Sequence, residues 1–400
     1  MRIAFFLEGR PGWMAGHTYL ANLLKAMRLA DDQIEICLLR RPDEDIVSSS
    51  ARASTERANH VLEWPTLHLE RWSLPWAQAQ LYRRVLRRDY PDRTLNDFLA
   101  ANHVDVVFGS WWQYPGSSVF PAVGMCAWIH DFQFLHFPDF YDAGTRQSTL
   151  RGIPRMADAA KRVVVSSQDA LKDLLSFVPG AAPKARVLPF VADVPAQIYE
   201  SDPSTVLRQY HLPAKFIYLP NQFWQHKNHR QVLAALHILS RRGINPYLVC
   251  TGLPHDYKKP AHFAELLTLI SEWGLHQQII FLGLVPIDDV KALMRQALCV
   301  LNPSLFEGWS STVEEAKSLG KPLLLSGLPV HREQNPPDTL FFDPQDPEDL
   351  AGKLRTVWQE WSPGPDLRLE TMARQALPGR MRRFGETFLS IASEVAPTPK

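Results

Sequence analysis

Cysteine is scarce in this 400-residue sequence, and the spacing of its cysteines argues against both disulfide bonds and structural zinc sites. The 4 cysteines, Cys37, Cys126, Cys250 and Cys299, each lie within an apolar run and show no CxxC spacing with histidine partners. Such positions are typical of buried thiols, whereas disulfide frameworks and zinc sites need paired spacing. We therefore expect reduced cysteines and a reducing compartment.

Long apolar runs and excess charge are also missing. No uninterrupted apolar stretch reaches the length of about 18 residues that a membrane span needs, and the run Ile3–Leu7 is too short for a signal peptide. The formal net charge of +1 argues against nucleic-acid binding, because such domains are usually strongly basic. We assign no metal ligands and no cofactor, and we expect a cytoplasmic protein without a membrane-spanning segment.

The sequence does contain many short apolar runs that alternate with longer helical patterns. Runs of this kind are typical of parallel strands that are buried on both faces, and their alternation with helices indicates βαβ units. Among the helices, 229–241 places an apolar stripe on one face, and 288–298 begins with carboxylates. The expected strands are residues 2–7, 34–39, 104–108, 125–129, 162–165 and 186–190, followed by 216–219, 247–250, 279–282, 298–301, 322–325 and 339–342.

The length of the chain predicts two domains rather than one. The irregular, proline-containing segment 191–213 marks the linker, so we expect a first domain over 1–195 and a second over 205–378. An amphipathic stretch at 380–395 either completes the second domain or, as we favour, crosses back onto the first. The fold class is thus α/β, with two Rossmann-like, doubly wound domains facing across a cleft. Ligands of such folds bind at the carboxyl ends of the strands.

The strongest functional pattern lies between Leu298 and Gly320. A strand ends near Asn302, a loop carries Glu307 and Gly308, and a helix that opens near Ser310 carries Glu315. One carboxylate could bind sugar hydroxyls, the backbone amides of Gly308, Trp309 and Ser310 could bind an anion, and the second carboxylate could bind another hydroxyl-rich group. The alternative is an ordinary loop glutamate and a solvated helix glutamate, with Glu314 as the exposed member of its pair.

A second pattern follows the strand at 216–219. Lys227 stands just ahead of the helix that begins near Asn228, where a cation beside oriented amides suits a diphosphate. A solvated lysine in a polar loop is equally compatible with this segment.

The first expected domain offers weaker candidates. His130, followed by Asp131, ends a buried strand and could hydrogen-bond a sugar, although a histidine there is often structural. Gly16 opens a helix after the first strand and allows a close approach of phosphate or sugar. The aromatic residues Trp111, Trp112 and Tyr114 are acceptor-binding candidates or part of the core.

The run from Glu307 to Glu315 resembles the E-x7-E motif of the retaining glycosyltransferases of family 4, which have the GT-B fold. The resemblance implies that Glu307 contacts the donor sugar and that Glu315 binds the nucleotide ribose. Lys227 matches the second cation of the Arg-x5-Lys pair of this family, which holds the leaving diphosphate. Asn221 stands where the arginine is expected, and it can hydrogen-bond a phosphate but brings no charge. His130 is similar to the histidine that often binds the sugar in this family.

The implied reaction is transfer of a sugar from a nucleotide-sugar donor to a glycan or lipid-linked acceptor, without metal and with retention of configuration. Gly16 fits partially, because this family usually has two adjacent glycines where this chain has Ala15-Gly16. The basic stretch 81–88 is either a solvated surface or a contact with anionic lipid, which would place the enzyme at the inner face of a membrane. A sugar-nucleotide epimerase and a non-catalytic sugar-binding protein remain alternatives. No pattern indicates the base, the sugar or the oligomeric state.

Overall fold

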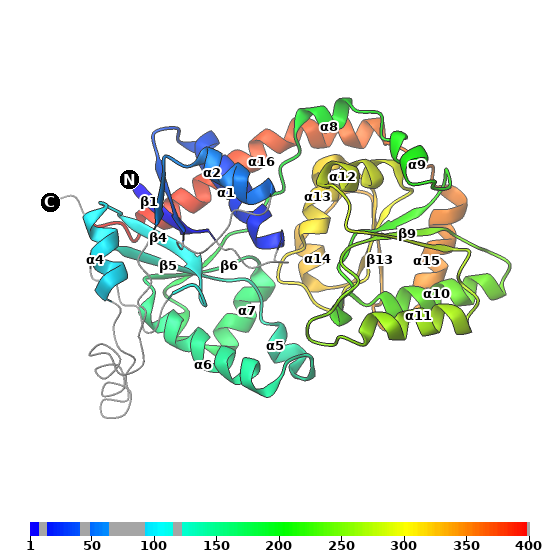
Figure 1. Cartoon of the computed structure of the whole chain (residues 1–400), viewed down its shortest axis with the longest axis horizontal. Coiled ribbons are helices and arrows are strands. Elements are labelled where there is room, and N and C mark those ends of the chain that lie inside the picture. The colour runs from blue at the N-terminus through cyan, green and yellow to red at the C-terminus, as the bar shows by residue number, and fades with distance from the viewer. Residues whose placement is uncertain (8–13, 41–48, 64–92, 115–121, 398–400) are drawn as a thin grey trace. The chain divides into compact units, whose positions relative to one another are not determined.

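The computed structural model describes residues 1–7, 14–40, 49–63, 93–114 and 122–397 (Figure 1). The described chain divides into two compact units. Unit 1 comprises Met1–Phe132, Ala143–Phe190 and Gly379–Lys400, and unit 2 comprises Gln133–Asp142 and Val191–Pro378. The basic stretch 81–88 lies outside the described residues. Among the residues that are described, no helix is both long and apolar enough to cross a membrane.

Unit 1 contains a parallel sheet of 7 strands in the order β3-β2-β1-β4-β5-β6-β7. The chain reverses the direction in which it adds strands between β1 and β4, as in a doubly wound sheet. These strands are β1 (Arg2–Phe6), β2 (Glu35–Arg40), β3 (His60–Glu63), β4 (Val106–Ser110), β5 (Gly124–Ile129), β6 (Arg162–Val165) and β7 (Ala185–Val187).

The helices of unit 1 include the end of a helix that begins in unit 2. They are α1 (Met14–Ala30), α2 (Ser49–Arg57), α4 (Arg93–Ala101), α6 (Ala143–Ala159), α7 (Gln168–Phe177), the short η2 (Pro179–Ala181) and the second part of α16 (Leu367–Ser393). The ring of Phe388, on α16, lies 5.6 Å from that of Phe5 and 5.1 Å from that of Phe108, so α16 packs on β1 and β4. The stretch predicted at 380–395 therefore belongs to unit 1.

Unit 2 repeats this architecture with 6 parallel strands in the order β10-β9-β8-β11-β12-β13, so its reversal lies between β8 and β11. Its strands are β8 (Ile217–Leu219), β9 (Leu248–Thr251), β10 (Ile279–Gly283), β11 (Val300–Asn302), β12 (Leu323–Ser326) and β13 (Thr339–Phe342). Its helices are α5 (Gln133–His136), η1 (Pro138–Phe140), α8 (Ala196–Glu200), α9 (Thr205–Gln209), η3 (Gln225–Lys227), α10 (His229–Arg241), α11 (His262–Glu272), α12 (Ile287–Gln296), α13 (Ser311–Leu319), α14 (Pro329–Gln334), α15 (Pro347–Glu360) and the start of α16.

Both sheets are parallel and doubly wound, and the 4 cysteines are free and buried, as predicted. Several predicted strand bounds are shifted by one or two residues, and other details also differ from the prediction. The edge strand β3 was missed because its HVLE sequence is largely exposed and has no apolar run. β7 ends at Val187, before the predicted end at residue 190. Unit 2 begins at Val191 and includes the short helices α8 and α9, so 191–213 is no bare linker.

Candidate functional site

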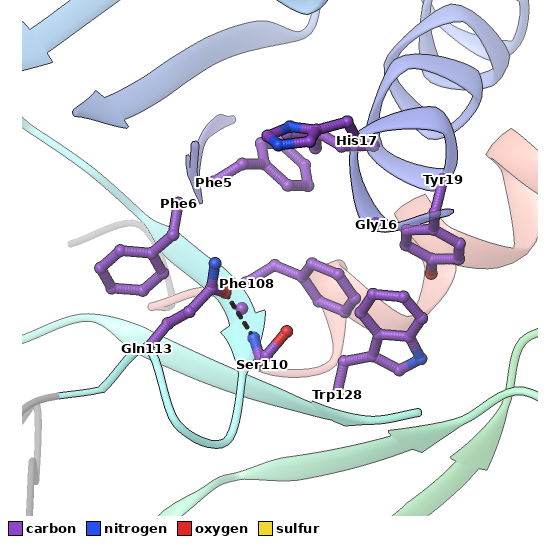
Figure 2. A pocket seen from close by; sticks show the side chains of 11 residues that line it. Phe5, Phe6, Gly16, His17, Tyr19, Phe108, Ser110, Gln113 and Trp128 are labelled. Carbon is purple, nitrogen blue, oxygen red and sulfur yellow. Dashed lines mark hydrogen bonds between the residues drawn. The ribbon is translucent and has the colours of Figure 1, made fainter. Parts of the chain in front are cut away.

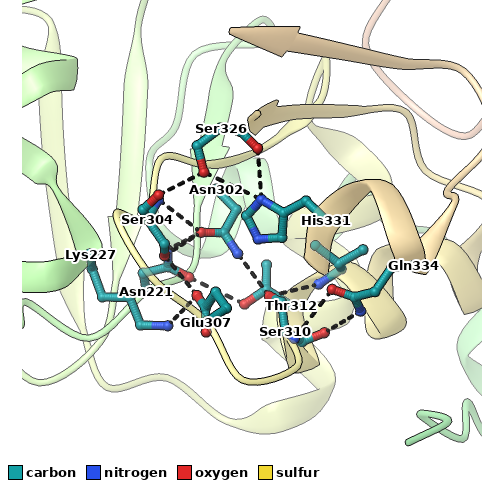
Figure 3. A network of polar contacts seen from close by, with 11 residues as sticks. Asn221, Lys227, Asn302, Ser304, Glu307, Ser310, Thr312, Ser326, His331 and Gln334 are labelled. Atoms are coloured by element: carbon teal, nitrogen blue, oxygen red, sulfur yellow. Dashed lines mark hydrogen bonds and ion pairs between the residues drawn. The ribbon is translucent and has the colours of Figure 1, made fainter. Parts of the chain in front are cut away.

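The reversal point of the second sheet brings together two segments that are about eighty residues apart in the sequence. Asn221 follows β8 and Asn302 ends β11, and the Asn221 Nδ2 donates a hydrogen bond to the Asn302 Oδ1 at 3.1 Å. Ligands of doubly wound folds bind at such a reversal, outside the carboxyl ends of the strands. The polar network of Figure 3 is built around this pair.

Lys227 and Glu307 form an ion pair at this edge of the sheet. The Lys227 Nζ lies 2.6 Å from the Glu307 Oε1, and the side chains are only 14% and 10% exposed. Asn228, which adopts a left-handed φ of 56°, ends η3 and donates from its Nδ2 to the carbonyl oxygens of Pro303 and Pro344. These hydrogen bonds hold the turn carrying Lys227 against the loop that follows β11.

The electrostatics of Glu307 are dominated by this pairing. Burial alone would raise the pKa of Glu307, but the charge of Lys227 lowers that pKa to about 2, with smaller contributions from His226, from His331 and from the hydrogen bond of Lys227. Burial lowers the pKa of both histidines, which therefore stay neutral near pH 7. Glu307 is thus ionised at every physiological pH, and Lys227 is its principal cation.

Buried polar side chains also form a hydrogen-bond network that reaches the Glu307 carboxylate. The Ser304 Oγ lies 2.7 Å from the Glu307 Oε1 and 2.7 Å from the Asn302 Oδ1, and it can donate its proton to either acceptor. The Ser326 Oγ donates to the Ser304 carbonyl oxygen at 2.7 Å, and the His331 Nδ1 donates to the Ser326 carbonyl oxygen at 2.9 Å. Sequence reasoning assigned no roles to these residues, although polar side chains at the ends of apolar strands are a usable signal.

Ser310 caps helix α13 and does not offer its amide to an anion, contrary to prediction. The Ser310 Oγ accepts from the Val313 amide and from the Asn302 Nδ2. The Ser310 N–H donates to the Gln334 Oε1 at 3.2 Å, and the Gln334 Nε2 donates back to the Ser310 carbonyl oxygen at 3.0 Å (Figure 3). The loop that contains Gly308 and Trp309 precedes this cap, so its amides stay candidates for anion binding.

Asn221 is part of the same internal network. It is only 3% exposed, its Nδ2 donates to Asn302, and its Oδ1 accepts from the Thr312 Oγ1 at 3.2 Å. It therefore ties the first turn of α13 to the end of β8. The prediction that Asn221 supports a diphosphate directly does not fit these contacts, because its amide group is already engaged inside the protein.

The two neighbouring carboxylates of α13 have opposite environments. Glu314 was expected to be the exposed one, but it is 1% exposed, and its Oε1 accepts from the Gln334 Nε2 and pairs with Lys317. Glu315 is half-buried, and among the described residues it has neither a hydrogen-bond nor an ion-pair partner. Burial raises the pKa of Glu315 to about 7, against an opposing effect of Lys291. Such a side chain is suited to accept hydrogen bonds from hydroxyl groups of a ligand.

In unit 1, His130 lies at the end of β5 beside the end of β4. Its Nε2 is 2.9 Å from the Ser110 Oγ, and its ring centre is 3.9 Å from that of Trp128 and 4.4 Å from that of Trp112. Burial lowers the pKa of His130 to about 3, so the imidazole is neutral at physiological pH. A neutral ring that is bonded to Ser110 can hydrogen-bond a hydroxyl but carries no charge for a phosphate.

A pocket lies next to this pair, at the reversal point between β1 and β4 (Figure 2). Gly16 and His17, at the start of α1, form one side of it, and Ser110 forms another. The aromatic side chains that line the pocket are Phe5, Phe6, Tyr19, Phe108 and Trp128. The pocket therefore combines apolar ring surface with a polar edge, and it includes the glycine predicted from the sequence.

The three aromatic acceptor candidates have different environments. Tyr114 is 5% exposed, its hydroxyl donates to the Cys126 carbonyl oxygen at 2.8 Å, and its ring packs on Phe6. It is therefore a core residue, and its assignment as an acceptor candidate was wrong. Trp111 and Trp112 are half-buried, with their rings 5.8 Å apart, and both stay candidates.

No metal centre is found among the described residues, since they include no group of three or more histidine, cysteine or acidic side chains able to hold an ion.

Comparison with known protein structures identifies the architecture. HepE of Anabaena, solved with UDP and glucose, superposes with a TM-score of 0.63 at 16% identity, covering 99% of this chain and 98% of HepE. A glycosyltransferase from Rickettsia africae gives a TM-score of 0.64 at 15% identity, with 98% of both chains covered. The chain therefore has the GT-B fold, with two Rossmann-like units.

The family match lies in the second unit. The family model described as "Glycosyl transferases group 1" matches residues 209–375, which is most of unit 2. The O-antigen biosynthesis glycosyltransferase WclY of Escherichia coli is 32% identical over 86 residues, which is 22% of this chain and 24% of WclY. The match thus spans about a quarter of that relative.

Proposed function

We propose that the protein is a glycosyltransferase that moves a sugar from a nucleotide-sugar donor to a glycan or lipid-linked acceptor, with retention of the anomeric configuration. The GT-B fold and the family match over residues 209–375 support glycosyl transfer. The partial likeness to WclY, which is named for O-antigen biosynthesis, supports a role in assembling a polysaccharide or related glycoconjugate.

One observation carries the proposal: the half-buried Lys227–Glu307 ion pair at the reversal point of the second sheet. A nucleotide diphosphate needs a cation, and a sugar needs a carboxylate acceptor for its hydroxyl groups. Here both groups lie at one sheet edge, and Glu315, in the helix that follows the Glu307 loop, has its accepting oxygens available for a ribose. The opposed pKa shifts of Glu307 and Glu315 fit different roles for two carboxylates of one site.

In the proposed reaction, the bond between the anomeric carbon and the leaving phosphate oxygen breaks, and the acceptor oxygen bonds to the same face of that carbon. The acceptor proton passes to the departing phosphate, so no separate general base is required. Lys227 and the amides near Gly308 stabilise the charge that develops on the diphosphate, an effect worth a few kcal/mol per hydrogen-bond donor. Glu307 orients the sugar, and neutral His130 stays a candidate for hydrogen bonding to its hydroxyl groups.

The first test is thermal stabilisation by UDP, GDP and ADP and by their sugar conjugates, with EDTA present. A ligand at about 100 times its Kd adds about 2.7 kcal/mol to stability, which raises the Tm by several degrees. We expect one base to give this shift without metal. If no nucleotide or nucleotide sugar stabilises the protein, the proposed donor site is wrong.

Product analysis then separates transfer from related chemistry. Incubation with the stabilising nucleotide sugar and an acceptor should yield free nucleotide diphosphate and an acceptor that is heavier by one sugar. Conversion of the nucleotide sugar into an isomer of equal mass, without any acceptor, would indicate an epimerase instead.

A further inference from the structure

The segment Gln133–Asp142 leaves unit 1 after Phe132, belongs to unit 2, and returns to unit 1 at Ala143. We call this segment the strap. It comprises the short helices α5 and η1 and the residues that connect them. Nothing in the pattern of apolar residues indicated that this segment packs on unit 2.

A polar clasp holds the strap at both of its ends. The Lys258 Nζ donates to the Gln133 Oε1 at 2.8 Å, and the Tyr141 hydroxyl donates to the same oxygen at 2.9 Å. The Lys258 Nζ also lies 3.8 Å from the centre of the Tyr141 ring, within the range of a cation–π interaction. Gln133 is 4% exposed, so this clasp is shielded from water on at least one side.

Between its clasped ends, the strap places aromatic rings beside Phe306, the residue before Glu307. The ring centres of His136 and Phe137 lie 5.0 Å and 6.5 Å from that of Phe306. Phe137 and Phe140 are stacked, with centres 5.0 Å apart and ring planes at 18°. His136 is exposed and the three phenylalanines are half-buried, so this aromatic cluster beside Phe306, the residue before Glu307, is partly accessible to solvent.

We propose that the strap and Phe306 form a subsite for the acceptor's sugar ring, and that Lys258 is the residue that positions this subsite. This inference rests on the proposed transferase function. The acceptor oxygen must reach the anomeric carbon of a sugar held by Glu307. The acceptor's sugar ring therefore has to lie next to the donor sugar ring that contacts this carboxylate. The apolar C–H face of a sugar packs on aromatic rings, while its hydroxyl groups stay hydrated.

The subsite is tested with Phe137→Ala, using methyl glucoside, methyl galactoside and methyl mannoside as acceptor probes. Loss of one stacked ring should raise the KM for the accepted methyl glycoside about tenfold. The Tm shift caused by the nucleotide sugar should stay unchanged, and Phe137→Tyr, which keeps the ring, should restore the wild-type KM. An unchanged acceptor KM, or an equal loss of nucleotide-sugar binding, would overturn the subsite.

The positioning role of Lys258 has a readout that needs no acceptor. In Lys258→Met, hydrogen exchange of the strap amides should accelerate, while Lys258→Arg should keep slow exchange. Lys259→Met is the matched control, because this neighbouring lysine pairs with Glu265 of α11 instead. Equal exchange in Lys258→Met and Lys259→Met would contradict the clasp.

Failure of this inference differs from failure of the proposed function. If the wild type binds a nucleotide sugar but neither binds nor glycosylates any of the methyl glycosides, the strap does not recognise a sugar ring and the subsite is wrong. If the wild type binds no nucleotide sugar, the transferase function fails first, and the acceptor subsite fails with it.

Discussion

At the scale of single residues, the main electrostatic feature of the site is the neutralisation of the Lys227 ammonium by the Glu307 carboxylate. Without ligand, the Lys227 ammonium is neutralised by Glu307 at 2.6 Å, in surroundings that exclude most water. A diphosphate must therefore compete with Glu307 for the same cation. Once Lys227 turns to phosphate, Glu307 has lost its main partner and is stabilised again only if sugar hydroxyls bond to it. At the proposed donor site, this exchange would favour a whole nucleotide sugar over the bare nucleotide.

Glu307→Gln should separate these two effects. Removal of the carboxylate charge frees Lys227, so we expect the affinity for the bare nucleotide diphosphate to rise, while turnover falls by about 100-fold or more. Titration calorimetry and initial rates measure the two quantities. Glu265→Gln, at the exposed pair with Lys259, is the control that should change neither. Weaker nucleotide binding by Glu307→Gln would argue against the competition, and near-normal turnover would argue against the role of Glu307.

Ionisation of the Glu315 carboxyl group destabilises the folded protein, and this effect can be measured. Its pKa rises from 4.5, the ordinary value of a solvated glutamate, to about 7 in the folded protein. Its contribution to stability is therefore fully present below pH 4.5 and is lost as pH rises through 7. We expect Glu315→Gln to be more stable than the wild type by about 1–3 kcal/mol at pH 8 and by clearly less at pH 5. Urea denaturation at both pH values tests this.

The same variant should weaken nucleotide binding, because an amide is a poorer acceptor for ribose hydroxyls than a carboxylate. Greater stability together with lower affinity is the combination expected of a binding residue. A variant that is less stable at pH 8 would instead show that the Glu315 carboxylate has a structural partner.

At the scale of elements, the position of helix α13, which is fixed at both of its ends, determines where Glu307 and Glu315 lie. Ser310 caps its start, and Gly320 ends it with a left-handed φ of 66°. A Cβ on Gly320 would meet the Leu369 backbone at 2.4 Å, so α13 is locked against the start of α16. The loop with Glu307 precedes the helix and Glu315 lies within it, so a shift of α13 would alter both.

Gly320→Ala and Gly274→Ala form a matched pair for this argument. Both glycines have a φ of 66°, but a Cβ on Gly274 has open space around it. Gly274→Ala should therefore cost only the backbone strain, about 1 kcal/mol. Gly320→Ala should cost about 1–3 kcal/mol more, because the neighbouring backbone has to move. Equal losses in guanidinium denaturation would show that α16 is not packed tightly against Gly320.

At the scale of the whole molecule, helix α16 connects the units. It begins in unit 2, passes Pro378 and continues in unit 1 from Gly379. There Phe388 is fully buried against Phe5 and Phe108, and a Cβ on Gly385 would come within 2.1 Å of the Ala26 carbonyl oxygen. The core of unit 1 is thus completed by the last part of the chain.

Phe388→Ala should therefore act on one unit. We expect the core of unit 1 to lose about 3–5 kcal/mol, while unit 2 still binds the nucleotide with wild-type affinity. Hydrogen exchange of β1 and β4, compared with that of β8 and β11, measures the first effect, and calorimetric titration measures the second. Faster exchange in both sheets to the same extent would mean that the units unfold together.

Local sequence alone was sufficient for most of the regular structure. The apolar run 322–325 predicted a buried parallel strand that is observed as β12, one residue further on, and helix α10 was predicted with the observed bounds because its apolar stripe is regular. The pairing of Lys227 with Glu307 was not foreseen, although both residues were singled out, because their contact depends on the order of β8 and β11 in the sheet.

What the sequence by itself determined is the set of chemically suitable residues at strand ends, since residue type and local pattern are enough to identify them. Only the tertiary structure decided their roles. Asn221 and Ser310 were predicted to contact ligand, Glu314 to be exposed, and Tyr114 to bind acceptor or belong to the core. In the folded chain all four hydrogen-bond within the protein. The strap was equally hidden, because its position in unit 2 depends on contacts with Lys258 and Phe306. Burial and partner choice are set by residues distant in sequence, which local patterns cannot specify.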